Sequence, residues 1–395
     1  MATPKISFVR GAGGLGRPLP NNDHISALLF FNDTLPTGFT TTDRTKAVFS
    51  LEQAETMGII EGSTNHAVEH YQIKTFFDQN PAGKLWVSIQ VLTAMTTDFG
   101  EIMEIQSIAN GEIRQIGIVD LSGTTLVRIG TNDVHDLIQT QINALKLIDQ
   151  PIQCLIGFDD SGLTDATDYT TLSAETASNV SIVIGQDGTK VGAALATTNG
   201  TAIPAVGAFL GAVSAAKVNE NIGWVAKFNF ASTGEFSVPK LGSGELFKNI
   251  SAALETSLNN YGYLFLKTHT GRAGTFANYS WTAVGQSDDF STIENNRTMD
   301  KAIRQIRTFM LPNLNSPVDV NDDGTLTDNA IAVFENACSR GLDSMERDTE
   351  ISAFNVKIDS TQDILTTSNM IISVAIVPVG VAKQITINIG FAVSV

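Results

Sequence analysis

The chain has 395 residues, of which 43% are hydrophobic and only 17% are charged. This length predicts two or three domains, and a charged fraction below the roughly 25% of ordinary soluble proteins is typical of a subunit that hides much of its surface in contacts. With 25 basic and 41 acidic residues, the net charge is −16, which argues against nucleic acid as the main partner. We find no signal segment and no run of about 18 apolar residues, and therefore expect neither secretion nor membrane insertion.

Residues 1–22 are expected to form an extended arm. Ile6 and Phe8 fall on one face of a short strand. A glycine-rich stretch follows, with Gly11, Gly13, Gly14 and Gly16. Its spacing matches the dinucleotide-binding fingerprint, but that fingerprint works only when a helix begins beneath the pyrophosphate. Pro18 and Pro20 stand where this helix would run, so we interpret the glycines as a hinge and expect no cofactor.

Residues 23–280 are predicted to form an α/β middle domain, because strand-like and helix-like segments alternate along most of this region. Expected helices cover residues 51–57, 64–80, 99–109, 133–148, 205–217 and 247–260. Expected strands cover residues 27–31, 84–91, 114–119, 152–158, 180–184, 224–230, 263–268 and 279–284. This order predicts a mixed or largely parallel sheet with helices on its faces.

Residues 281–395 are predicted to form a separate C-terminal α+β domain. Two amphipathic helices are expected at 297–310 and 327–346, followed by strands at 353–359, 370–377 and 384–395. The fold class is thus α/β plus α+β, with an extended strand arm at each end.

The final predicted strand alternates apolar with small or polar residues. Its apolar face comprises Ile385, Ile387, Ile389, Phe391, Val393 and Val395. One interpretation is a last strand of the protein's own sheet. The other is a strand that pairs with a neighbouring copy by β-augmentation, since an unpaired apolar strand is otherwise an aggregation hazard.

Two motifs have the spacing of metal sites. His66-x-x-Glu69-His70 matches the inverted zinc-protease motif on the helix expected at 64–80, although no third ligand is evident and a structural role for the histidines is the alternative. Asp319-x-Asn321-x-Asp323-Gly324 matches the first half of a calcium loop, but position twelve is Ala330 in place of glutamate. For this second motif a tight turn is the favoured interpretation.

The remaining histidines, His24, His135 and His269, have no cysteine or serine context typical of a nucleophilic catalyst. We therefore expect no enzyme activity and no bound metal.

One helix concentrates basic side chains in this acidic chain. Arg297, Lys301, Arg304 and Arg307 recur at spacings of four, three and three, so a helix brings them to one side. Such a run is often simply a solvated face. The alternative is a docking surface for an acidic partner.

The order of motifs in the last third of the chain resembles the C-terminal domain of phage tail-sheath proteins and of sheaths in related contractile injection systems. The motifs are Asn296-Arg-Thr-x-Asp300-Lys-Ala, Leu311-Pro, Asp319-x-Asn-x-Asp-Gly-Thr-Leu, Glu350-Ile-Ser-x-Phe-x-Val-x-Ile-Asp359, Ile376-Val-Pro378-Val-Gly380 and Ile385-x-Ile-x-Ile-Gly390-Phe. The segment from His70 to Pro81 also looks sheath-like.

The resemblance implies a structural subunit that polymerises as a helix of hexameric rings around an inner tube and contracts to drive the tube through a target envelope. Its partners would be further copies of itself, the inner tube protein, and baseplate and terminator proteins. Both arms would lend strands to neighbours, the middle domain would face outward, and the basic helix would meet the tube. The location would be a virion tail, or the bacterial cytoplasm as part of an assembled apparatus.

Two other classes stay open on the sequence. One is a zinc hydrolase that uses His66 and His70. The other is a different self-assembling structural protein, such as a capsid or surface-layer subunit.

Overall fold

The computed structural model describes residues 22–92, 98–119, 133–387 and 389. It contains two compact units, Met1–Asp300 and Lys301–Val395, which we describe separately. The boundary between them falls inside a helix, whereas we expected the C-terminal domain to begin at residue 281. No helix in the described part of the chain has the length and apolar character needed to cross a membrane.

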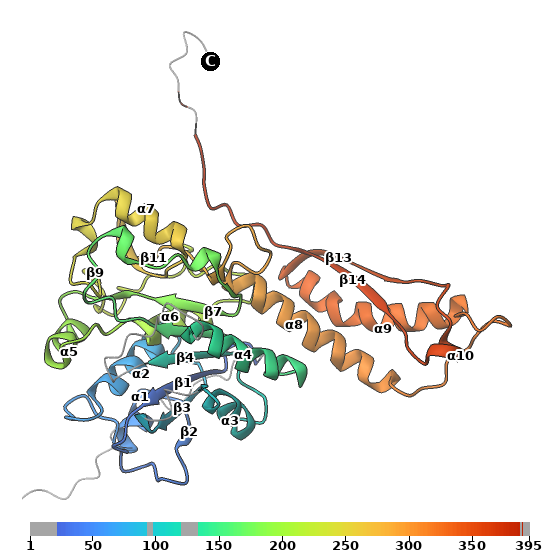
Figure 1. Ribbon diagram of the computed structural model, residues 1–395, viewed down its shortest axis with the longest axis horizontal. Helices are drawn as coiled ribbons and strands as arrows, with labels where there is room; N and C mark the ends of the chain where they lie inside the picture. The colour runs from blue at the N-terminus through green and yellow to red at the C-terminus, as the bar shows by residue number, and fades with distance from the viewer. Residues whose placement is uncertain (1–21, 93–97, 120–132, 388, 390–395) are drawn as a thin grey trace, which may run out of the picture. The chain divides into compact units, whose positions relative to one another are not determined.

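The first unit is built on a six-stranded sheet with the order β2-β3-β1-β4-β5-β7 (Figure 1). Its strands are β1 (Ser26–Phe31), β2 (Thr45–Val48), β3 (Leu85–Gln90), β4 (Gln115–Val119), β5 (Gln153–Gly157) and β7 (Val180–Val183). All neighbouring pairs are parallel except β2 with β3. The predicted mixed, largely parallel sheet is confirmed.

Helices cover both faces of this sheet, because its central strands are apolar on both sides. The described helices that precede α8 are α1 (Leu51–Thr56), α2 (Ala67–Gln79), α3 (Glu101–Ile108), α4 (Val134–Leu147), α5 (Val191–Asn199), α6 (Val206–Ala215) and α7 (Ala252–Tyr261). Leu28 and Phe30 of β1 belong to the core cluster that contains α2 and α6. Ala27, Leu29 and Phe31 belong to the cluster that contains α3 and α4.

Among its described residues the first unit also has three two-stranded sheets: β6 (Thr176–Ala177) with β12 (Ala283–Val284), β8 (Gly185–Asp187) with β9 (Pro239–Leu241), and β10 (Leu266–His269) with β11 (Arg272–Ala277). The predicted strand at 224–230 is wrong. This segment forms turns, in which the N–H groups of Lys227 and Phe228 donate to the Trp224 carbonyl. Its apolar residues Phe228 and Phe230 are core residues without being strand residues.

The second unit contains the C-terminal part of α8 (Ile293–Met310), α9 (Asp328–Arg347), α10 (Ile364–Thr367) and a hairpin of β13 (Ile351–Ile358) and β14 (Ile372–Pro378). Thr327 caps α9 by accepting from the N–H of Ala330. Gly341 of α9 allows close helix contact, since an added Cβ would lie 2.8 Å from the Ile306 nitrogen. Both predicted helices and the first two predicted strands are present, with small shifts of their ends.

Candidate assembly surfaces

The β13–β14 sheet has one buried face and two open edges. Phe354 and Val356 of β13, with Val374 and Ile376 of β14, pack on the small core around Ala302, Leu342 and Met345. The alternate residues, such as Asn355 and Ala375, are exposed. Among the described residues this sheet consists of these two strands alone. Each strand therefore presents an edge that a further strand could pair with.

The segment that follows β14 is extended and lies outside any sheet in the described residues (Figure 1). Ile385 and Ile387 are each 74% exposed, and Ile389 is 92% exposed. This alternation pairs with no strand among the described residues, and its assignment to the protein's own sheet or to a neighbouring copy stays a prediction. Phe391 and Val393 lie outside the described residues, as do Ile6, Phe8 and the predicted hinge glycines Gly11, Gly13, Gly14 and Gly16.

The predicted basic strip on α8 needs correction, beginning with Arg297. This side chain is only 4% exposed. Its guanidinium donates to the backbone carbonyls of Asp23, at 3.2 Å, and Ala216, at 3.3 Å. Helical spacing indicates on which side of a helix a residue lies, but not which groups pack against that side. The sequence therefore suggested that Arg297 belongs to an exposed basic face. Arg297 is a buried structural residue of the first unit.

Lys301 is also buried. Its ammonium group lies 2.7 Å from a carboxylate oxygen of Glu350, just before β13, and both side chains are at most 10% exposed. Arg307 is exposed and Arg304 is partly exposed. The strip that could meet a partner is therefore reduced to these two arginines.

The His66-x-x-Glu69-His70 motif does not assemble a metal site. His66 Nδ1 lies 3.3 Å from Glu69 Oε1, whereas His70 Nε2 lies 2.9 Å from Glu55 Oε1 on α1. The two imidazoles thus have different carboxylate partners. Within the described ranges, these residues do not form part of a cluster of three or more potential metal ligands. The structural interpretation of the two histidines accounts for their contacts.

The motif at residues 319–327 forms a turn. Val320 and Leu326 are bridged, and Gly324 has a φ of 83°, which favours glycine. Asp323 accepts hydrogen bonds from the hydroxyl and N–H of Thr325, at 2.6 and 3.1 Å. These bonds lower the pKa of Asp323. The aspartate therefore closes the turn itself, as the favoured interpretation expected.

Comparison with solved structures defines the class of fold. A chain of the anti-feeding prophage (AFP) baseplate superposes with a TM-score of 0.64 at 13% identity, covering 99% of both chains. The AFP helical sheath in its contracted state gives 0.62 at 14% identity, again with 99% of both chains. The sheath tail protein of Desulfitobacterium hafniense gives 0.53 at 9% identity, over 95% of this chain and 100% of that one. The chain has the fold of contractile-sheath proteins, and the predicted resemblance is confirmed.

Family models name the group more closely. The model described as DUF2586, N-terminal domain, matches residues 4–280, and that described as DUF2586, C-terminal domain, matches residues 289–395. The chain belongs to the DUF2586 family. Among curated proteins, no sequence matches it.

Proposed function

We propose that this protein is a structural subunit of a contractile tail sheath. It polymerises helically, as hexameric rings, around an inner tube and contracts to drive that tube through a target envelope. It acts in a virion tail or within an injection apparatus assembled in the bacterial cytoplasm. Baseplate and terminator proteins are its partners at the ends of the sheath, and the middle domain faces outward.

This proposal rests on two features of the described residues: the strand-like segment after β14 has no pairing partner, and the β13–β14 sheet has open edges. Ile385, Ile387 and Ile389 are exposed, while β13 and β14 each have an unpaired edge in the described residues. A C-terminal segment that adds to the hairpin of a neighbouring copy would satisfy both. Main-chain hydrogen bonds would provide affinity, and the alternate isoleucines would provide specificity.

The energetics suit a stable link between subunits. Burying an exposed isoleucine side chain contributes roughly 1.5–3 kcal/mol, so three of them offset part of the entropy lost when the segment becomes ordered. The same segment in every copy, received by the same hairpin in the next, makes a head-to-tail contact, and such contacts build helical filaments when the rotation does not close.

The N-terminal arm would form the second link. Ile6 and Phe8 would pair with a neighbouring subunit, and Gly11, Gly13, Gly14 and Gly16 would let the body rotate against that strand, since glycine adopts both signs of φ at little cost. These residues lie outside the described part of the chain, so this part of the proposal depends on the sequence pattern.

Deleting residues 385–395 tests the proposal. The truncated subunit should remain folded and soluble but should no longer form striated hollow cylinders in negative-stain images, because the segment's partners lie in another copy. Circular dichroism and size-exclusion chromatography would establish that the subunit is folded.

A deletion removes the backbone and the side chains of the segment together. A matched pair of double substitutions tests its apolar face alone. Ile385→Asp with Ile387→Asp places charge on the apolar face and should abolish cylinders. Gln384→Asp with Thr386→Asp adds the same charge on the opposite face and should preserve them. Unfolding of the truncated subunit would mean that the segment belongs to its own sheet. Shells or flat lattices from the intact protein would point to the capsid or surface-layer class.

A further inference from the structure

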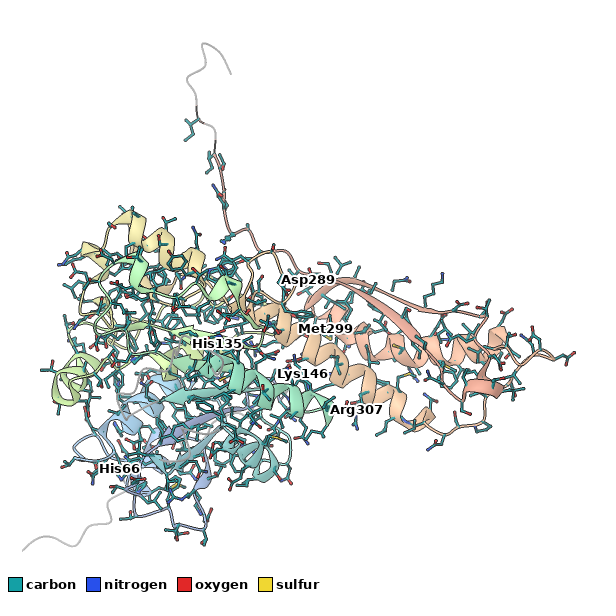
Figure 2. The ribbon with its side chains drawn as sticks, in the orientation of Figure 1. His66, His135, Lys146, Asp289, Met299 and Arg307 are labelled. Carbon is teal, nitrogen blue, oxygen red and sulfur yellow. The ribbon has the colours of Figure 1, made fainter. Side chains whose placement is uncertain are left out.

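Four potential metal ligands meet where α4 begins. Asp133 occupies the residue before the helix, and His135 and Asp136 lie in its first turn. Glu175 ends the short 3₁₀ helix Leu172–Ala174 and precedes β6. One ligand atom from each of these residues lies within 4.8 Å of the others. All four belong to the first unit, and Figure 2 labels His135 on α4.

The imidazole of His135 is the second observation that points to a ligand. Its side chain is 1% exposed, yet neither ring nitrogen makes a hydrogen bond in the described structure. Nε2 lies 3.3 Å from Glu175 Oε2 and 3.9 Å from Asp136 Oδ1. Buried polar groups are nearly always hydrogen-bonded, and an exception calls for a water or an ion that would satisfy it.

We propose that Asp133, His135, Asp136 and Glu175 bind a divalent transition-metal ion. An imidazole nitrogen combined with carboxylate oxygens suits Zn²⁺ and Mn²⁺, whereas Ca²⁺ and Mg²⁺ prefer ligand sets made of oxygen alone. Ligand atoms around an ion with bonds of about 2.1 Å lie roughly 3–4.2 Å apart. Small changes of side-chain rotamer therefore bring this cluster to coordination distance.

The exposure of the ligands gives the ion a route in. The Asp136 and Glu175 side chains are 48% and 25% exposed, so they reach solvent while the imidazole beneath them is buried. Within the described residues, the ion pairs of Asp136 and Glu175 are those to His135. Three carboxylates around one imidazole make a site whose negative charge a divalent cation would largely offset.

The ion would stabilise this unit by linking two segments that are distant in the sequence. It would tie the first turn of α4 to the residue before β6, and β6 pairs in turn with β12. This inference is independent of the proposed sheath role, because it concerns the stability of the first unit and not assembly.

The test uses the full chain after chelation and dialysis. Isothermal titration with Zn²⁺ and Mn²⁺ should give one site per chain, and each ion should raise the thermal unfolding midpoint, since an ion that binds only the folded state stabilises it. Ca²⁺ and Mg²⁺ should have much less effect. Co²⁺ should give visible absorption bands typical of a bound ion with a nitrogen ligand.

His135→Gln and Glu175→Gln should each weaken the affinity at least about tenfold, given that even loss of outer-shell groups costs 10–100-fold. Glu175→Gln is nearly isosteric at a partly exposed position, which keeps the test valid if His135→Gln fails to fold. His70→Gln is the matched control, because it removes another buried histidine with a carboxylate neighbour, and it should retain binding. Absence of Zn²⁺ and Mn²⁺ binding, or equal affinity in wild type and Glu175→Gln, would overturn the proposal and leave a simple contact between histidine and carboxylate.

Discussion

At the scale of single residues, Asp160 has a buried carboxyl group whose Oδ2 accepts a hydrogen bond from the Tyr169 hydroxyl. It follows β5 and has no exposed surface. The hydroxyl of Tyr169 donates to its Oδ2 at 2.8 Å, while Oδ1 has no hydrogen-bond partner in the described structure. Burial raises the pKa of Asp160 to about 7. Nothing in the local sequence Phe158-Asp-Asp-Ser-Gly162 distinguishes this aspartate from its neighbour Asp159.

The pKa of Asp160 makes stability depend on pH in a defined direction. An unfolded aspartate titrates near 4, so between about pH 4 and pH 7 the folded protein retains a proton that the unfolded chain releases. The free energy of unfolding therefore falls as pH rises through that window. Asp160→Asn should be more stable than wild type at pH 8, by on the order of 2 kcal/mol, and this advantage should vanish near pH 4.

Thermal unfolding midpoints measured from pH 4 to pH 8 would check this expectation. Asp159→Asn is the control, because its carboxylate accepts from the N–H groups of Ser161 and Ala202, and its loss should bring no stabilisation at pH 8. A wild-type-like pH profile in Asp160→Asn would contradict the buried, proton-retaining state of this residue.

At the scale of elements, α6 and α2 are in close contact because two glycines of α6 face the backbone of α2. An added Cβ at Gly207 would lie 2.0 Å from the Gln72 carbonyl oxygen, and one at Gly211 would lie 2.5 Å from that of Phe76. The Gln72 side chain closes the contact by accepting from the Gly207 N–H at 2.7 Å and donating to the Pro204 carbonyl at 2.8 Å.

Gly207→Ala should therefore destabilise the first unit, although alanine favours helix by about 1 kcal/mol. The clash is with backbone, which cannot move without shifting a whole helix, so the net loss should be about 1–3 kcal/mol. Chemical denaturation would measure it. Gly162→Ala, where no atom lies within 4 Å of the added Cβ, should change stability little, and a neutral Gly207→Ala would contradict this packing.

The elements themselves were largely predictable, while some of their contacts were not. Helices at 64–80, 133–148 and 205–217 and strands at 84–91 and 152–158 were predicted because their apolar spacing is a local property. Strand β11 and helix α5 were missed. Residues 224–230 were wrongly predicted as a strand, because buried aromatic residues occur in turns as well as in strands. The proximity of His135 and Glu175 was also not predicted, since these residues lie far apart in the sequence.

At the scale of the whole molecule, the net charge is −16, because 41 acidic residues outnumber 25 basic ones. Arg304 and Arg307 remain the part of the predicted basic strip that reaches the surface. We propose that they meet an acidic inner tube in the extended state and release it on contraction. Exposed ion pairs contribute only about 0–1 kcal/mol each, which suits a contact that must break.

Arg304→Glu with Arg307→Glu should yield sheaths that assemble without a tube or that contract early, as seen by electron microscopy of co-expressed sheath and tube. Arg340→Glu with Arg347→Glu makes the same change of charge at exposed positions of α9 and should leave filled, extended sheaths. Filled sheaths from both variants would show that the tube contact lies elsewhere.

The sequence by itself determined the α/β and α+β classes, most helices and strands, the alternating apolar C-terminal segment and the resemblance to sheath proteins. The fold classes, the elements and the alternating segment follow from spacing along the chain, which the periods of helix and strand convert directly into faces, whereas the resemblance follows from the order of motifs. Only the tertiary structure decided which charged residues are buried. Arg297 meets the carbonyls of Asp23 and Ala216, and Lys301 meets Glu350. Burial of a charge depends on compensating groups that the fold brings from distant segments, and no local pattern records them.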